Sequence, residues 1–216
     1  MGHRGKFISF EGPDGAGKTS VLTAIQARLA PKLGKRLIVT REPGGDPIAE
    51  QIRAVILDRK NQAMDVRTEA LLYAASRRQH VVSTILPALE NGQLVLCDRF
   101  VDSSIAYQGA GRKIGEQSIA EINHFATQGL LPAKTIYFDI PVSMGLKRIA
   151  QHRDTKKIDR LDVETVDFHE RVHAGYDRLI KQNPDRYVVI DASQELDVVV
   201  EEVLSAIKVV TPEYFD

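Results

Sequence analysis

The sequence contains a single cysteine, Cys97, so a disulfide within the chain is excluded and a disulfide-stapled secreted domain is not expected. It also has no net charge, because its 29 basic and 29 acidic residues cancel. Nothing global therefore attracts the protein to DNA, RNA or an anionic membrane. No apolar run approaches the roughly 18 residues of a membrane span. These absences predict a cytoplasmic protein that binds neither nucleic acid nor membrane, and any anion site must be local.

What the chain does have is the composition of an ordinary globular protein. Of its 216 residues, 43% are hydrophobic and 27% are charged, which is enough to build a buried core. Its length fits one α/β domain, and we find no internal repeat and no Ser/Gly-rich linker. We therefore expect residues 1–216 to form a single domain.

Strand and helix patterns alternate along the chain. The strand patterns cover residues 6–10, 36–40, 94–97, 134–140 and 186–190. The longest helical pattern, residues 65–91, places Leu71, Leu72, Ala75 and Val82 on one side. Five strands with crossover helices predict an α/β fold with a three-layer, doubly wound parallel sheet. Ligands of such sheets bind beyond the carboxyl ends of the strands.

A glycine-rich segment lies between the first strand pattern and the next helical pattern. It matches G-x-x-x-x-G-K-[ST] and reads Gly12-Pro13-Asp14-Gly15-Ala16-Gly17-Lys18-Thr19, followed by Ser20. In such a loop, successive backbone N–H groups converge on phosphate oxygens at a helix N-terminus. Lys18 is expected to reach the β- and γ-phosphates of ATP, and the Thr19 hydroxyl to ligate Mg²⁺. The segment predicts a P-loop NTPase in which all of these residues bind the nucleotide.

An acidic and a basic residue, Asp98 and Arg99, follow the buried strand that ends at Cys97. A carboxylate at a strand end beside a phosphate loop is a Walker B candidate, which holds Mg²⁺ directly or through water. A guanidinium next to it suits the charge of a phosphate site. We therefore predict that Asp98 is a metal ligand and that Arg99 is catalytic.

Arginines are unusually frequent at this edge of the predicted sheet. Arg41 follows the second strand in a tight Pro-Gly-Gly loop, and Arg53, Arg77 and Arg78 lie on the helices after it. We find no general base for an alcohol acceptor and no group that would orient water. A phosphate acceptor needs neither, because with a second pKa of about 6 it is already an anion at neutral pH. Several fixed guanidiniums would offset the repulsion between two polyanions, so the pattern favours a kinase that acts on a phosphate.

A short charged segment at about residues 150–162 is flanked by helical patterns. We expect it to be a lid whose closure excludes water and places Arg153 or Arg160 on the transferring phosphoryl group. Both arginines are therefore catalytic candidates, although Lys156 and Lys157 compete for this role.

Together these motifs resemble one family, thymidylate kinase, from Phe7 to about Ile207. The residue blocks that carry the resemblance are Phe10-Glu11-Gly12 with its loop, Thr40 to Gly45, Leu71 to Arg78, Asp98-Arg99-Phe100 and Ala106-Tyr107-Gln108-Gly109. The resemblance implies the nucleoside monophosphate kinase type of the P-loop fold, transfer of the ATP γ-phosphate to dTMP with Mg²⁺, and a homodimer. Gly15 stands where some relatives place a catalytic arginine, so the chain looks like the bacterial type with a basic lid. Phe100 departs from the more common Tyr or His.

The resemblance also implies roles for individual residues at the acceptor side. Tyr73 looks like the aromatic side chain that stacks on thymine, and Arg77 and Gln108 look like the residues that bind the pyrimidine edge. Tyr107 matches the position that crowds the ribose 2′ carbon, and Asp14 matches the acid that meets the 3′-OH. The further substrate-binding candidates are Arg41, Pro43, Arg53, Arg99, Ser103 and Ser104. At the donor side, Arg148 resembles the arginine that packs on adenine.

Three alternatives remain. The nearest is a kinase for another pyrimidine monophosphate, such as dUMP or dCMP. A nucleotide-binding switch is more distant, because the sequence lacks the N-K-x-D guanine motif. The third is a zinc protease, because residues 169–173 match H-E-x-x-H. Against this last reading, the apolar stripe of that helix leaves His169 and His173 on its flank, and no third ligand is evident.

Overall fold

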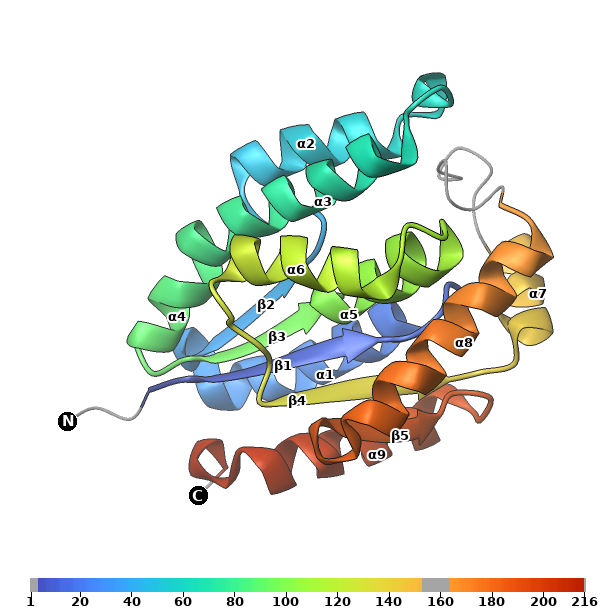
Figure 1. The fold of residues 1–216 in the computed structure, drawn as a ribbon. Coiled ribbons are helices and arrows are strands. Elements are labelled where there is room, and N and C mark those ends of the chain that lie inside the picture. Colours follow the sequence, from blue (N-terminus) through green and yellow to red (C-terminus); the bar gives the residue numbers. More distant parts are fainter. Residues whose placement is uncertain (1–3, 153–163, 216) are drawn as a thin grey trace.

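The computed structural model describes residues 4–152 and 164–215 as three layers of helix, sheet and helix (Figure 1). The strands are β1 (Lys6–Glu11), β2 (Leu37–Arg41), β3 (Leu94–Asp98), β4 (Lys134–Asp139) and β5 (Tyr187–Asp191). All strand pairs are parallel, and the order across the sheet is β2-β3-β1-β4-β5. The prediction of a five-stranded, doubly wound parallel sheet is confirmed.

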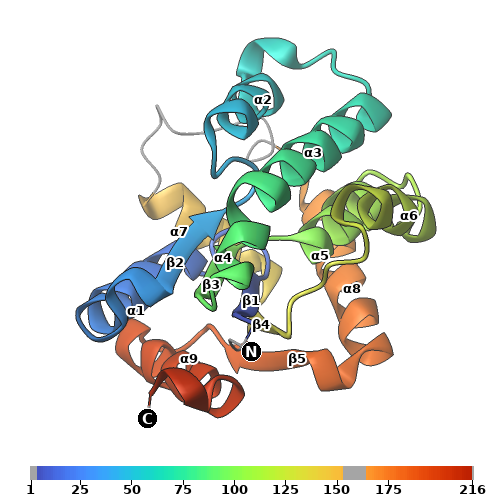
Figure 2. The same cartoon turned by 90° about the vertical axis from the view of Figure 1, so that its left-hand side faces the viewer.

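The helices cover both faces of this sheet. Their bounds are α1 (Lys18–Leu33), α2 (Pro47–Leu57), α3 (Val66–His80), α4 (Leu86–Glu90), α5 (Val101–Ser104), α6 (Glu116–Thr127), α7 (Val142–His152), α8 (Val166–Gln182) and α9 (Leu196–Val210). Figure 2, which looks along the strands, shows α1 and α9 on one side and α3, α5 and α8 on the other. Shorter 3-10 turns lie at Gly34–Arg36, Arg59–Asn61, Pro184–Arg186 and Pro212–Tyr214.

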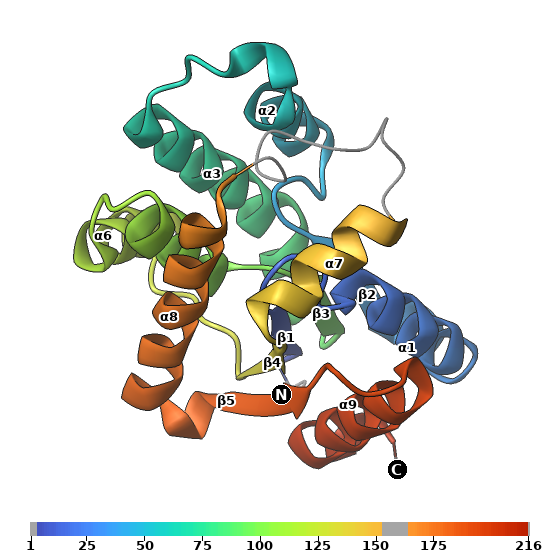
Figure 3. The same cartoon turned by 90° about the vertical axis from the view of Figure 1, so that its right-hand side faces the viewer.

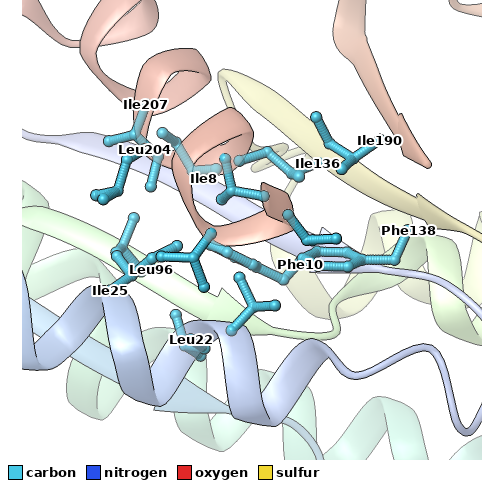
Figure 4. Packing of buried hydrophobic residues seen from close by; sticks show 14 of the residues in the cluster. Ile8, Phe10, Leu22, Ile25, Leu96, Ile136, Phe138, Ile190, Leu204 and Ile207 are labelled. Atoms are coloured by element: carbon cyan, nitrogen blue, oxygen red, sulfur yellow. The ribbon is translucent and has the colours of Figure 1, made fainter. Parts of the chain in front are cut away.

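The main hydrophobic core lies between the sheet and the α1–α9 layer (Figure 4). Strand residues such as Ile8 and Phe138 pack there against Ile25 of α1 and Leu204 of α9. The helical spacing of Val21, Leu22, Ile25 and Leu29 buries all four side chains. A second cluster covers the opposite face, where Val95 and Cys97 meet Val81 and Ile85. Both faces of β3 are therefore covered, as its lack of polar alternation predicts.

Several helices begin at an acceptor side chain that the sequence supplies. Asp46 caps α2 by accepting hydrogen bonds from the backbone amides of Ile48 and Ala49. Asp65 caps α3, and Thr165 caps α8 in the same way. These caps satisfy amides that have no partner within the helix, and each typically contributes about 1 kcal/mol.

The long helix predicted at residues 65–91 is divided. A π-helical turn, Val81–Ile85, separates α3 from α4 and continues their path. The apolar side described from the sequence is not the buried face, because Leu71, Ala75 and Val82 are exposed and Leu72 is half-buried. The buried face instead carries Ala70, Tyr73, Ala74, Arg77 and Val81, which share the helical period. Arg77 breaks the apolar pattern on that face, and its hydrogen bonds, described below, explain why a cation is tolerated there.

The register aligns the strand ends that carry polar residues. Asp98 pairs with Phe10 of β1 on one side and with Arg41 of β2 on the other. The loops after these three strands therefore meet at one edge of the sheet, where α7 also lies (Figure 3). The fold thus brings the phosphate loop, Arg41 and Asp98-Arg99 to a common place.

Candidate active site

The phosphate loop joins β1 to α1 and depends on glycine at specific positions. Gly12, Gly15 and Gly17 all have positive φ angles, of 144°, 78° and 84°. A Cβ atom on Gly15 would lie 2.2 Å from the carbonyl oxygen of Gly145 in α7, which no side chain tolerates. The loop and α7 are therefore in backbone contact, and the absence of an arginine at position 15 is a steric requirement of this packing.

Lys18 folds back over the loop in the described structure. Its Nζ atom donates hydrogen bonds to the carbonyl oxygens of Gly12, at 3.0 Å, and Pro13, at 2.8 Å. Burial, followed by the positive charge of Arg99, lowers the pKa of Lys18 to about 8. In the described part of the chain, the hydrogen-bond acceptors of this buried ammonium group are two carbonyl oxygens and no carboxylate. It can therefore bind an anion, because a phosphate would supply a directly bonded negative charge.

Thr19 and Asp98 form a pair between α1 and the end of β3. The Thr19 hydroxyl donates a 2.9 Å hydrogen bond to Oδ2 of Asp98, while Oδ1 of Asp98 is buried and has no hydrogen-bond partner. One hydroxyl oxygen and one carboxylate with an unsatisfied oxygen fit a hard divalent cation that completes its shell with phosphate and water. In the described parts of the chain, no cluster of three or more His, Cys, Asp or Glu side chains could hold a metal.

Arg99 adopts a left-handed backbone conformation, with φ of 70°, which is rare outside glycine. Its Nη2 atom lies 2.7 Å from Oδ1 of Asp14 in the phosphate loop. The Tyr107 hydroxyl donates a 2.8 Å hydrogen bond to Asp14 Oδ2, and the Arg99 guanidinium stacks over the Tyr107 ring. Asp14 is thus held in one cluster with Arg99 and Tyr107, which lie 85 and 93 positions away in the sequence.

Glu11 underlies this cluster, and the sequence analysis assigned it no role. The buried carboxylate accepts hydrogen bonds from the backbone amide of Phe100 at 2.7 Å, the Ser103 hydroxyl at 2.5 Å and the Tyr176 hydroxyl at 2.9 Å. Burial, followed by the negative charge of Asp102, raises the pKa of Glu11 to about 7. The sequence did contain a signal for this role, since Glu11 directly follows the mainly apolar segment Phe7–Phe10 of β1. A carboxylate at such a position is buried and therefore needs hydrogen-bond partners.

Arg77 is fully buried, unlike a typical solvated arginine. Its guanidinium donates to Glu42 at 2.6 Å, to Ser104 at 2.9 Å and to the Phe100 carbonyl at 2.9 Å, and also to Asn123. Glu42 in turn receives a 2.9 Å contact from His80. The arginine predicted to bind a base therefore also holds α3, α5 and α6 together.

Two arginines, Arg41 and Arg53, use part of their hydrogen-bonding capacity to bind the Pro-Gly-Gly loop. Arg41 and Arg53 each donate a hydrogen bond to the Pro43 carbonyl, at 2.9 and 2.8 Å. Arg41 also pairs with Glu50 at 3.0 Å. Arg41, Pro43 and Arg53 nevertheless remain in the wall of the cavity described next.

A cavity of about 1100 Å³ gathers most of the predicted site residues. The predicted residues that line it are Asp14, Gly15, Ala16, Gly17, Lys18, Thr19, Ser20, Arg41, Pro43, Arg53, Tyr73, Arg77, Asp98, Arg99, Ser103, Ser104, Tyr107, Gln108 and Arg148. Gly12 and Pro13 lie behind this wall, where their carbonyl oxygens bind Lys18. Arg153 and Arg160, and with them residues 153–162 of the predicted lid, lie outside the described residues.

In the cavity wall, Arg148 reaches the loop between β5 and α9. Its guanidinium donates to the carbonyls of Ala192, at 2.8 Å, and Ser193, at 3.3 Å. Gln194, Glu195, Leu196 and Val199 line the same cavity, and sequence reasoning did not identify this segment. A flat guanidinium held beside a short loop offers one face to an aromatic base.

The H-E-x-x-H segment does not form a metal site with other described side chains. His169 is buried, with Nε2 unpartnered and a pKa lowered by that burial, so the prediction that it lies on the helix flank was wrong. His173 lies 3.3 Å from Asp139 and 3.6 Å from Asp177.

Cys97 is buried, and burial raises the pKa of its thiol well above the ordinary value, which argues against a role as a nucleophile. Among the described helices, none is long and apolar enough to cross a membrane.

Comparison with known proteins gives one consistent result. Residues 10–203 match the family model described as thymidylate kinase. The chain is 63% identical to thymidylate kinase of Levilactobacillus brevis over 98% of this chain and 99% of the relative. It is 61% identical to thymidylate kinase of Lactiplantibacillus plantarum, over 97% and 95% of the two chains, and 59% identical to that of Enterococcus faecalis, over 98% and 100%.

Proposed function

The chain belongs to the thymidylate kinase family, and we propose that it transfers the γ-phosphate of ATP to dTMP, giving dTDP and ADP. The observation that carries the proposal is the cavity whose wall contains Arg148, the phosphate loop and Tyr73. A cavity of about 1100 Å³ that is lined by the phosphate loop, several arginines and an aromatic side chain suits two nucleotides whose phosphates face each other.

At the donor end, Arg148 packs on adenine and the loop amides bind the phosphates. Lys18 exchanges its loop carbonyls for phosphate oxygens, where its charge stabilises the transferring group. Thr19 and Asp98 hold Mg²⁺, since the unpartnered Asp98 oxygen is available to it. Bound there, the ion would neutralise part of the phosphate charge.

At the acceptor end, Tyr73 stacks on the thymine, and Arg77 and Gln108 bind its edge. Asp14 and Tyr107 meet the sugar, since they are paired at 2.8 Å on one side of the cavity. Arg53 and Arg99 bind the acceptor phosphate, with Ser103 supporting Arg99 through a 3.0 Å hydrogen bond. No general base is required, because the phosphate nucleophile with its second pKa of about 6 is already deprotonated.

Exposed apolar side chains support a homodimer. Leu71 of α3, Val82 of the π-helical turn after it and Phe125 of α6 are exposed, and α3 and α6 pack against each other. Apolar groups of this size on adjacent helices are typical of an interface.

We also place the enzyme in the cytoplasm, because its one thiol, Cys97, is buried and has no second cysteine to pair with.

The direct test is ADP release at fixed ATP, measured across the common nucleoside monophosphates. The expected result is that dTMP gives the highest kcat/KM and that omission of Mg²⁺ abolishes turnover. A preference for dUMP or dCMP would support a different pyrimidine kinase. ADP release that is independent of every monophosphate would contradict phosphoryl transfer to a nucleotide.

A further inference from the structure

The side-chain amide of Gln108 is fixed by a buried carboxylate. Its Nε2 atom donates a 2.9 Å hydrogen bond to Oε1 of Glu69, and both residues are buried. Arg112 donates to both oxygens of Glu69, from Nε and Nη2, at 3.2 Å each. A carboxylate beside a guanidinium only accepts hydrogen bonds, so the amide must turn its NH2 group toward Glu69.

This orientation determines what Gln108 offers to the cavity that it lines. Nε2 keeps a second N–H, but the carbonyl oxygen is turned away from Glu69 and is the acceptor that the amide offers to the cavity. Arg77, which also lines the cavity, offers only donors. Four of its five N–H groups are used, by Glu42, Ser104, Asn123 and the carbonyl of Phe100. Because Arg77 donates a hydrogen bond to Ser104, four residues before Gln108, this acceptor and the remaining donor belong to the same part of the cavity wall.

We propose that Glu69 is a positioning residue for base selection, which holds Gln108 in the orientation that accepts a hydrogen bond from a 4-oxo pyrimidine. The inference rests on the proposed function. Thymine and uracil carry an N3–H donor next to the O4 acceptor, which complements Gln108 and Arg77. Cytosine carries the reverse, an N3 acceptor next to an N4 amino donor, so both contacts would be mispaired.

Burial gives this arrangement its selective strength. Because Glu69 and Gln108 are closed to solvent, water does not compete for the amide, and the Gln108 side chain cannot turn over without placing its oxygen against the carboxylate. A site built to hydrogen-bond a substrate rejects an analogue that leaves its polar groups unpaired much more strongly than a merely apolar pocket does. Uracil presents the same N3–H and O4 groups as thymine. Glu69 therefore discriminates 4-oxo from 4-amino pyrimidines and does not contribute to recognition of the 5-methyl group.

The test compares two substrates that differ only at this edge, dTMP and 5-methyl-dCMP. In Glu69→Gln the new amide can donate to Gln108 or accept from it, so both orientations of Gln108 become available. The ratio of kcat/KM for dTMP to that for 5-methyl-dCMP should fall at least tenfold, the equivalent of one hydrogen bond. A purely structural role would lower both values equally and leave the ratio unchanged, which would overturn the proposal.

A matched control is Glu164→Gln, because Glu164 is the other partner of Arg112, at 2.6 Å, and does not touch Gln108. Its substrate ratio should equal that of the wild type, and a fall as large as that of Glu69→Gln would also contradict the proposal. If Glu69→Gln does not fold, Glu69→Asp provides the same test, because it keeps the charge beside Arg112 and draws the carboxylate away from Gln108. Failure of the proposed function itself is distinguished by the wild type, which would then not turn over dTMP.

Discussion

The carboxylate of Glu11 accepts a 2.7 Å hydrogen bond from the backbone amide of Phe100, the residue directly after Arg99. This contact holds the chain where Arg99 adopts its left-handed conformation. Ser103 and Tyr176, which also donate to Glu11, both contact the Arg99 guanidinium, at 3.0 and 3.5 Å. Glu11 thus fixes both the backbone and the side chain of the arginine assigned to the acceptor phosphate.

Glu11→Gln should lower kcat/KM for dTMP by about tenfold or more, because a misplaced guanidinium loses transition-state contacts. The carboxyl group ionises at a pKa of about 7, raised from its ordinary value, and its ionised form is the one that accepts all three hydrogen bonds. The ratio of wild-type to variant kcat/KM should therefore rise as the pH increases through about 7. Taking the ratio cancels the ionisation of dTMP, and a ratio that stays flat from acid to alkaline pH would refute this role.

Affinity for ATP should decrease as the pH rises above about 8. The pKa of Lys18 is lowered to about 8 in the free protein, so at higher pH the ammonium charge must be restored when phosphate binds. Calorimetry in buffers of different ionisation enthalpy should show proton uptake on ATP binding in this range. Lys18→Arg stays charged at all these pH values and should lose the proton uptake. Proton uptake that persists in Lys18→Arg would show that another group is responsible.

Comparing Gly15→Ala with Gly17→Ala separates two contributions to the loss of stability, the cost of the backbone conformation and the cost of a packing clash. Both glycines have positive φ, so each substitution costs about 1–2 kcal/mol of stability for the conformation alone. Only Gly15→Ala places a methyl group 2.2 Å from Gly145, whereas nothing lies within 4 Å of the added atom in Gly17→Ala. Urea unfolding should show a further loss of about 1–3 kcal/mol for Gly15→Ala. Equal losses in the two variants would mean that the contact between the loop and α7 does not constrain position 15.

Arg77→Ala should destabilise the fold as well as base binding. It leaves the buried carboxylate of Glu42 with His80 as its remaining side-chain partner, and an uncompensated buried charge costs about 3–5 kcal/mol. Arg78→Ala is the control. Arg78, the neighbour of Arg77 on α3, donates a single 3.3 Å hydrogen bond to the Ala126 carbonyl, so its loss should cost about 1 kcal/mol or less. Denaturant midpoints of the two variants provide the comparison. Similar midpoints would show that Arg77 is not a structural anchor.

Strand patterns and the phosphate-loop spacing are local signals, and they were sufficient for the sheet, the phosphate loop and Asp98-Arg99. The roles of the acceptor-side residues and of Arg148 came from the family resemblance, because no local pattern reports them. The sequence was misleading for α3 and the π-helical turn after it, where the buried face carries Arg77 and the apolar Leu71 and Val82 are exposed. It also could not assign Glu11 or Glu69. The role of each buried carboxylate depends on partners more than 35 positions away in the chain, and no periodicity reports such pairings.

The most direct test of the account is a crystal structure with dTMP and a non-hydrolysable ATP analogue bound together. The account predicts thymine between Tyr73 and Gln108, adenine on Arg148, and the two phosphate chains meeting in line beside Lys18 and Arg99. A structure in which the thymine edge faces away from Gln108, or in which the two nucleotides compete for one end of the cavity, would contradict it.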